Sequence, residues 1–334
     1  MFTGRKRRIG SLSSILAVLA LVLGASTFGL NAPRATAAGS QPSLASVDGL
    51  GTAKFTSEGG ASPLRTANTI PYWGSSFTYG GVTYPYFMVG TNPSNGAVST
   101  SVPTVIIPFR FVFETSASAN NVLDGASKTN LTLQSPIFQH ANFKTGSTFV
   151  GNTQYGDAIQ KAMFWNTGGN AAGYHVLLNN TQVYPTVTIA VPQNQGSLVV
   201  GSHSGARIGL ISYYWFSAQL RQIINQLHVP STVTPIILTD NTFLYIHDQA
   251  DCCVIGYHGA GSSANGNGAQ QIQTYIYSAY IAPGVFGAPA IQDVHALSHE
   301  VSEWMADPFV NNFGAALADA DRAAVWLHLL PRNR

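Results

Sequence analysis

The sequence predicts an α+β protein built on a twisted mixed sheet with packed helices. The strand signal comes from runs of β-branched and aromatic residues at 104–113, 233–240 and 273–281. The helix signal comes from apolar residues at helical spacing, and a further helix is expected from residue 289 or 293, directly after the last strand. Strands and helices that do not alternate strictly are typical of α+β proteins.

The predicted strands differ in their expected places. Residues 77–87 alternate in polarity and are interrupted by Gly80-Gly81, which predicts a hairpin. Pro108 lies within the run that starts at Thr104, and since proline has no N–H to donate, it favours an edge strand or a bulge. The run 233–240 is almost continuously apolar, which predicts a central strand.

Three helices are expected before the last one, at 135–141, 155–165 and 213–227. In the second of these, Ile159, Met163 and Phe164 are predicted to form the buried face.

The N-terminus has the three parts of a secretory leader. Arg5 to Arg8 form a basic region, 15–23 is apolar, and Ala35-Thr36-Ala37 fits a cleavage site. A retained membrane anchor is the alternative, but the apolar run is short for a span of about 20 residues. We therefore expect a signal peptide at 1–37 and a secreted or periplasmic protein that leaves the membrane after cleavage.

The rest of the chain divides by composition. Residues 38–69 are rich in Ser, Gly, Ala and Pro, which predicts a flexible linker or pro-segment. Residues 70–312 are expected to form one α+β domain. The tail at 313–334 is rich in Ala, Leu and Arg, and this divergent composition predicts that it packs loosely or not at all.

The surface chemistry excludes one class of partner. Charged residues make up only 9% of the chain, and the net charge of +2 is partly due to the leader. No basic patch remains to attract phosphates, so nucleic-acid binding is not expected. Cys252 and Cys253 are adjacent, which rules out a zinc-ribbon spacing and leaves a vicinal disulfide, free thiols or pairing with other chains.

The strongest functional motif is His299-Glu300-Val-Ser-Glu303. On a helix the first and fifth positions lie one turn apart, so His299 and Glu303 can reach one metal ion. Glu300 would then lie beside the metal and act as the general base. Zinc accepts both imidazole nitrogen and carboxylate oxygen, so we expect a zinc site.

A zinc site normally needs at least three protein ligands. His295 is one further turn back on the same helix, and His258 lies in Gly-Tyr-His-Gly-Ala on an earlier strand. Both stay open as the third ligand. The alternative is a buried helix whose His and Glu side chains pair with one another.

The longer stretch from Leu297 to Asn312, with Asp307-Pro308 after the motif, resembles the secreted EXORDIUM-like, phosphate-induced proteins and related bacterial proteins regarded as metallopeptidases. Cys252 to Ala260 resembles the bacterial members. The order of helix, strands and metal-site helix is similar to zinc-peptidase domains. This resemblance implies a secreted, zincin-like metallopeptidase.

Two functions follow as expectations. The first is a metal-dependent peptidase that hydrolyses peptide or protein substrates through a metal-activated water. The second is a non-catalytic extracellular or cell-wall-associated binding protein, an inactive metallopeptidase relative, whose aromatic side chains stack on polysaccharide. The candidates for such stacking are Tyr72, Trp73, Tyr79, Tyr84 and Tyr86, or Tyr275, Tyr277 and Tyr280.

Overall fold

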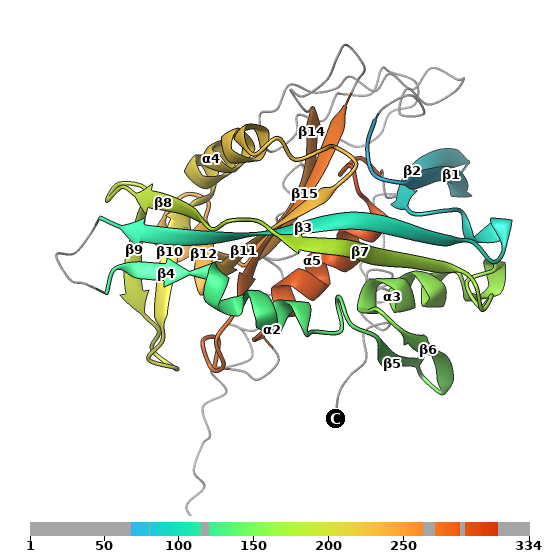
Figure 1. Cartoon of the computed structure of the whole chain (residues 1–334), viewed down its shortest axis with the longest axis horizontal. Coiled ribbons are helices and arrows are strands. Elements are labelled where there is room, and N and C mark those ends of the chain that lie inside the picture. Colours follow the sequence, from blue (N-terminus) through green and yellow to red (C-terminus); the bar gives the residue numbers. More distant parts are fainter. Residues whose placement is uncertain (1–67, 80, 115–119, 263–270, 288–290, 313–334) are drawn as a thin grey trace, which may run out of the picture.

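The computed structural model describes residues 68–79, 81–114, 120–262, 271–287 and 291–312 (Figure 1). The predicted leader, the tail from 313 and nearly all of the predicted linker lie outside the described residues. Within the described part the architecture is α+β, as the sequence predicts, with mixed sheets and four α-helices. None of the described helices has the length and apolarity that a membrane span requires.

A seven-stranded mixed sheet organises the fold. Its strand order is β14-β15-β11-β3-β4, and β7 and β8 also pair with β3. The bounds are β3 Ser99–Phe113, β4 Val122–Asp124, β7 His175–Val183, β8 Val187–Val191, β11 Thr234–Asp240, β14 Gly256–Ser262 and β15 Ile272–Tyr280. β11 is parallel to both β3 and β15, so the prediction of a central strand is confirmed.

The prediction that Pro108 marks an edge strand or a bulge is wrong. β3 pairs on both sides, with β11 and β4 along one edge and with β7 and then β8 along the other. The pairing with β7 ends at Ile106 and the pairing with β8 begins at Phe109. Pro108 therefore lies where β3 changes partners, and a central strand can tolerate a residue without an N–H there.

Three smaller sheets surround the large one. The predicted hairpin is confirmed as β1 Tyr72–Tyr79 and β2 Val82–Val89, which pair antiparallel. A second hairpin consists of β5 Ala141–Thr145 and β6 Thr148–Thr153. The third sheet has the order β13-β12-β10-β9, with bounds Cys252–Val254, Thr242–Tyr245, Arg207–Ser212 and Gly196–Val200.

The helices are α2 Thr129–Leu133, α3 Tyr155–Met163, α4 Tyr213–Gln226 and α5 His295–Ala306. The short helix expected at 135–141 is misplaced, because that segment is a turn followed by the start of β5 and the helix lies before it. The buried face of α3 is also different from the prediction. It carries Asp157, Gln160 and Lys161, whereas Ile159 and Met163 are only half-buried.

The large sheet has a separate core on each face. α4 covers one face, where Phe216 and Leu220 pack against side chains such as Phe109 and Tyr277. α5 covers the other face, where Val301 and Trp304 pack with residues that include Ile236, Leu238 and Ile276 (Figure 1). Because neighbouring residues of a strand point to opposite faces, β14 directs Tyr257 into the α4 core and His258 towards α5.

Candidate metal centre

Helix α5 carries the predicted motif, and its ends are set by the backbone. Of the two expected starts, 289 and 293, the second is the nearer: Val294 is the N-cap, and Asp293 forms a backbone bridge with Ile281. Asp293 has a φ of 60°, outside the geometry of an N-cap residue. The helix ends at Ala306, and Asp307 is its C-cap, because the residue before a proline disfavours the helical backbone.

The apolar residues of α5 recur at helical spacing, and this places the motif partly in the core and partly at the surface. Leu297, Val301 and Trp304 are buried against the sheet, whereas His299 and Glu303 lie on a half-buried flank. Glu300 is on the buried side and contacts β14. A Cβ atom at Gly256 would lie 2.8 Å from Glu300 Cγ and 3.0 Å from its Oε1, so the glycine makes room for this carboxyl group.

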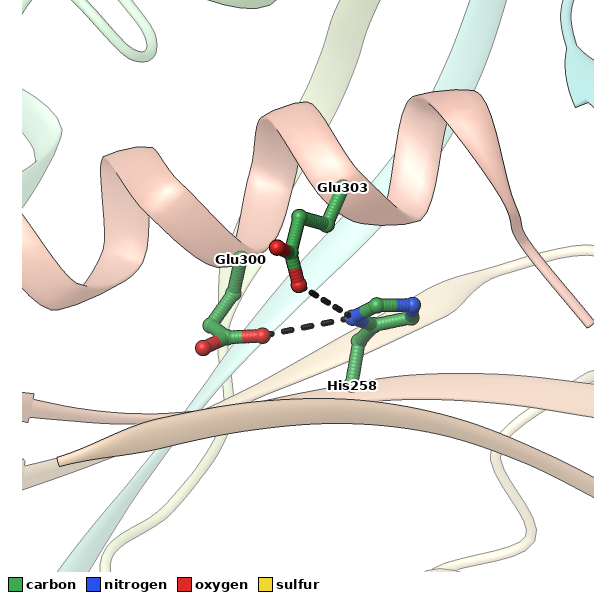
Figure 2. A group of neighbouring side chains, drawn as sticks. All are labelled: His258, Glu300 and Glu303. Carbon is green, nitrogen blue, oxygen red and sulfur yellow. Dashed lines mark hydrogen bonds and ion pairs between the residues drawn. The ribbon is translucent and has the colours of Figure 1, made fainter. Parts of the chain in front are cut away.

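Three side chains from β14 and α5 meet in this contact (Figure 2). His258 Nδ1 lies 3.2 Å from Glu300 Oε2 and 4.0 Å from Glu303 Oε2. One ligand atom from each of the three residues lies within 4.8 Å of the other two. The structure thus brings His258, an open candidate in the sequence, together with two carboxylates of the motif.

His299 contacts the outer side of the same cluster. Its Nε2 lies 3.1 Å from Glu303 Oε1, one turn away on the helix as the motif predicts. The contact is an ion pair without hydrogen-bond alignment, since Nε2 has no hydrogen-bond partner among the described residues. Glu303 therefore has one carboxylate oxygen towards His299 and the other towards His258.

Burial and mutual charge set the protonation of the inner pair. The side chains of His258 and Glu300 are only 8% and 4% exposed. Burial alone would lower the pKa of His258, but its hydrogen bond and ion pair with Glu300 outweigh burial, and its pKa is raised. Burial raises the pKa of Glu300, and the opposing effect of His258 does not cancel it.

The outer pair is more accessible, and its pKa shifts favour the charged form of both side chains. The side chains of His299 and Glu303 are 25% and 31% exposed. Burial opposes the charge on both, yet the pKa of His299 is raised by Glu303 and that of Glu303 is lowered by His299 and His258. In the absence of a metal, the cluster is therefore a network of ion pairs.

His295 does not join the cluster. Its side chain is exposed, and burial of part of the ring together with the neighbouring His299 lowers its pKa. Asp307 is the residue that the sequence analysis did not select. Burial raises its pKa, and its charge acts on His258. It follows Glu303 by one helical turn, so the spacing 299, 303, 307 is the signal that could have identified it.

Two other histidines lie in loops and are not part of this cluster. His203 is exposed in a turn, and His247 is exposed beyond β12. The carboxylate of Asp248 accepts the backbone N–H of Ala250 and caps a short 3₁₀ helix at 249–251. Cys252 and Cys253 form a disulfide with each other, which is one of the three alternatives left open by the sequence.

The three residues offer nitrogen and oxygen donors of the kind that a zinc ion accepts. Metal–ligand distances of about 2.0 to 2.1 Å in a tetrahedron place ligand atoms about 3.3 Å apart. The separations of 3.2 and 4.0 Å around His258 Nδ1 are close to that value. His258 Nε2, on the other side of the ring, is buried without a hydrogen-bond partner in the described part of the chain, which is uncommon in proteins.

A second buried polar network supports the fold beneath α5. The carboxylate of Asp157 accepts the Thr153 hydroxyl at 2.6 Å and the Val176 N–H at 2.6 Å, and lies 2.8 Å from His175 Nδ1. Lys161 donates to the backbone carbonyls of Ala171 and Tyr174. These bonds hold α3 against β7, so we assign this network a structural role.

No protein-family model, no curated protein and no solved structure matches this chain.

Proposed function

We propose that this protein is a metal-dependent hydrolase of the peptidase type, with one divalent ion held between β14 and α5. The observation that supports the proposal is the meeting of His258 with Glu300 and Glu303 across two elements far apart in the sequence. Several ionisable groups buried together are costly unless a metal or exact partners compensate their charge.

His258, Glu300 and Glu303 are the ligands in this proposal, and His299 holds Glu303 in place through its other oxygen. This differs from the assignment based on the motif alone, in which His299 and Glu303 are ligands and Glu300 is the base. The reason is that Glu300 faces His258 and is packed against Gly256. A zinc ion at such a site would lower the pKa of a bound water to about 7.

His299 is then the side chain best placed to exchange protons with a substrate. It is partly exposed, it contacts Glu303 rather than His258, and Glu303 raises its pKa, which favours the protonated form. The α4, β11 to β15, α5 order supports a zincin-like arrangement, in which the metal-site helix follows the sheet. The leader at 1–37 supports secretion and an extracellular peptide or protein as substrate.

Hydrolysis of internally quenched peptides by the full chain tests this function. Cleavage should require added zinc after chelation and should be lost in Glu303→Gln. Glu114→Gln is the matched control, because Glu114 is exposed at the end of β3, far from α5 in the sequence. Cleavage that persists after chelation, or in Glu303→Gln, would exclude a role for this centre.

A non-catalytic role is the second candidate, and the burial of His258 and Glu300 favours it. A closed metal site of this kind acts structurally, by joining α5 to β14. A structural role predicts that the protein binds metal and that chelation lowers its melting temperature, but that none of the internally quenched peptides is cleaved.

A further inference from the structure

One face of the β1–β2 hairpin is buried at its inner end and carries exposed and half-buried aromatic rings towards its tip. Antiparallel register places Trp73, Phe77, Tyr84 and Tyr86 on the same face, because Phe77 is opposite Tyr84 and Trp73 is opposite Met88. We call these four side chains the aromatic face. The Phe77 and Tyr84 rings are stacked with centroids 5.3 Å apart, and Phe77 is 45% exposed.

The rings of the aromatic face form a continuous row. Phe77 lies 6.3 Å from Tyr86, and Tyr86 lies 5.6 Å from Trp73, measured between centroids. Trp73 is buried at the inner end against Phe164, at 5.5 Å. The row therefore runs along the hairpin from buried Trp73 towards the tip, where Val82 is also exposed.

The opposite face and the outer edge of β2 anchor the hairpin to residues 309–312, which follow α5. The Asn312 side chain accepts the Phe87 N–H and donates to the Phe87 carbonyl, both at 2.7 Å. Phe309 packs edge-on against Tyr72, with centroids 5.1 Å apart. These contacts fix the hairpin before any ligand arrives, and such preorganisation reduces the entropic cost of binding.

We propose that the aromatic face binds a neutral polysaccharide chain. The hairpin has no Asp, Glu, Lys, Arg or His in either strand or in the turn, which disfavours nucleic acids and charged peptides. Sugar rings offer C–H faces that stack on aromatic rings and hydroxyls that bond to polar tips. The phenol groups of Tyr84 and Tyr86 and the hydroxyl of Ser75 lie on this face.

The dimensions of the face also favour a narrow, chain-like ligand over a second protein. Two strands of eight residues present a strip of about 27 by 10 Å, or roughly 270 Å². A stable protein interface buries about 800 Å² on each partner. A single polysaccharide chain fits the width of the strip, and this inference does not rest on the metal centre.

Retention of the full chain on insoluble cellulose, xylan and chitin, with soluble oligosaccharides as competitors, tests the proposal. At least one of these probes should retain the wild type, and Phe77→Ala and Tyr84→Ala should each weaken the affinity at least tenfold. Phe77→Trp, which keeps an aromatic ring at this position, should bind with the affinity of the wild type. Phe149→Ala is the matched control, because Phe149 is 51% exposed on the other hairpin, and it should bind as the wild type does.

Several results would overturn the proposal. No retention on any of the three probes would do so, as would equal retention of Phe77→Ala. A wild-type dimer in light scattering that Phe77→Ala converts to a monomer would assign the face to a second copy. Binding of a proline-rich peptide but of no polysaccharide would assign it to that class. Equal melting temperatures of the wild type and Phe77→Ala would show that the substitution leaves the fold intact. If Phe77→Ala melts at a lower temperature, the binding of Phe77→Trp decides instead, and loss of binding in Phe77→Trp would then contradict the proposal.

Discussion

At the scale of single residues, the protonation of His258 and His299 links the centre to pH. Both have raised pKa values, so the folded state binds their protons more tightly than the unfolded chain does. Their contribution to stability is complete below the ordinary histidine pKa of about 6.5 and is lost as pH rises through the raised values. The raised pKa of Glu300 acts in the same direction, because the folded state also favours its protonated form.

We therefore predict that the metal-free protein loses stability as pH rises above 6.5. The free energy of unfolding in urea, measured with chelator between about pH 5.5 and 8.5, should fall across this window. His258→Gln should flatten the curve, whereas His140→Gln, at an exposed position, should not. A wild-type curve that rises with pH would contradict the protonation described for the inner pair.

The inner pair also shows what a local motif can and cannot specify. His299 and Glu303 could be predicted as neighbours, because helical geometry alone places them one turn apart. The direction of Glu300 could not, because it depends on which strand packs against α5 and on the absence of a side chain at Gly256. His258 was an open candidate for the same reason, since its partners are 42 residues away.

At the scale of elements, the close approach of α5 to β14 depends on Gly256. We predict that Gly256→Ala weakens zinc affinity at least tenfold, because the new Cβ would displace the Glu300 carboxyl group. Overpacking of this kind also costs about 1 to 3 kcal/mol of stability. Zinc affinity can be measured by competition with a chromophoric chelator, alongside urea unfolding.

Gly259→Ala provides the matched control on the same strand. A Cβ there would meet the Tyr275 hydroxyl at 2.5 Å, on the face covered by α4. It should lower stability without changing zinc affinity. Equal losses of affinity in the two variants would show that the effect of Gly256→Ala is a general loss of packing.

The hydrogen bonds between the Asn312 side chain and the Phe87 backbone of β2, which we call the clamp, give a second prediction at this scale. Asn312→Ala removes hydrogen bonds to Phe87 and to the Ala306 carbonyl, and we expect a loss of about 1 to 3 kcal/mol. Asn152→Ala removes one exposed bond to Asn142 on the other hairpin and should cost less. Chemical denaturation of both variants checks this, and an equal cost would argue against a clamp.

Elements with a strong periodic pattern could be predicted, and those that depend on polar partners could not. α4, the β1–β2 hairpin and β11 follow their apolar patterns. α3 does not follow its apolar pattern. Its buried polar residues have hydrogen-bond partners, Asp157 in β7, Gln160 in β2 and Lys161 in the loop before β7, and these bonds offset the cost of burying them. The position of Pro108 depends on the partner change along β3, which no local pattern reveals.

At the scale of the whole molecule, two features converge on α5. One face of the helix meets His258 of the large sheet, and the turn beyond its end holds the hairpin that carries the aromatic face. Under the two proposals made above, the hairpin would anchor the protein to a polysaccharide while α5 and β14 would hold a metal.

Metal content measures the central proposal most directly. The full chain, purified with zinc and desalted at about pH 8, where metal no longer competes with protons on histidine, should carry one zinc ion per chain by elemental analysis. Glu303→Gln and His258→Ala should each lose it, and Glu114→Gln should retain it. A wild type without metal at that pH, or Glu303→Gln and His258→Ala with as much metal as the wild type, would contradict a metal centre between β14 and α5.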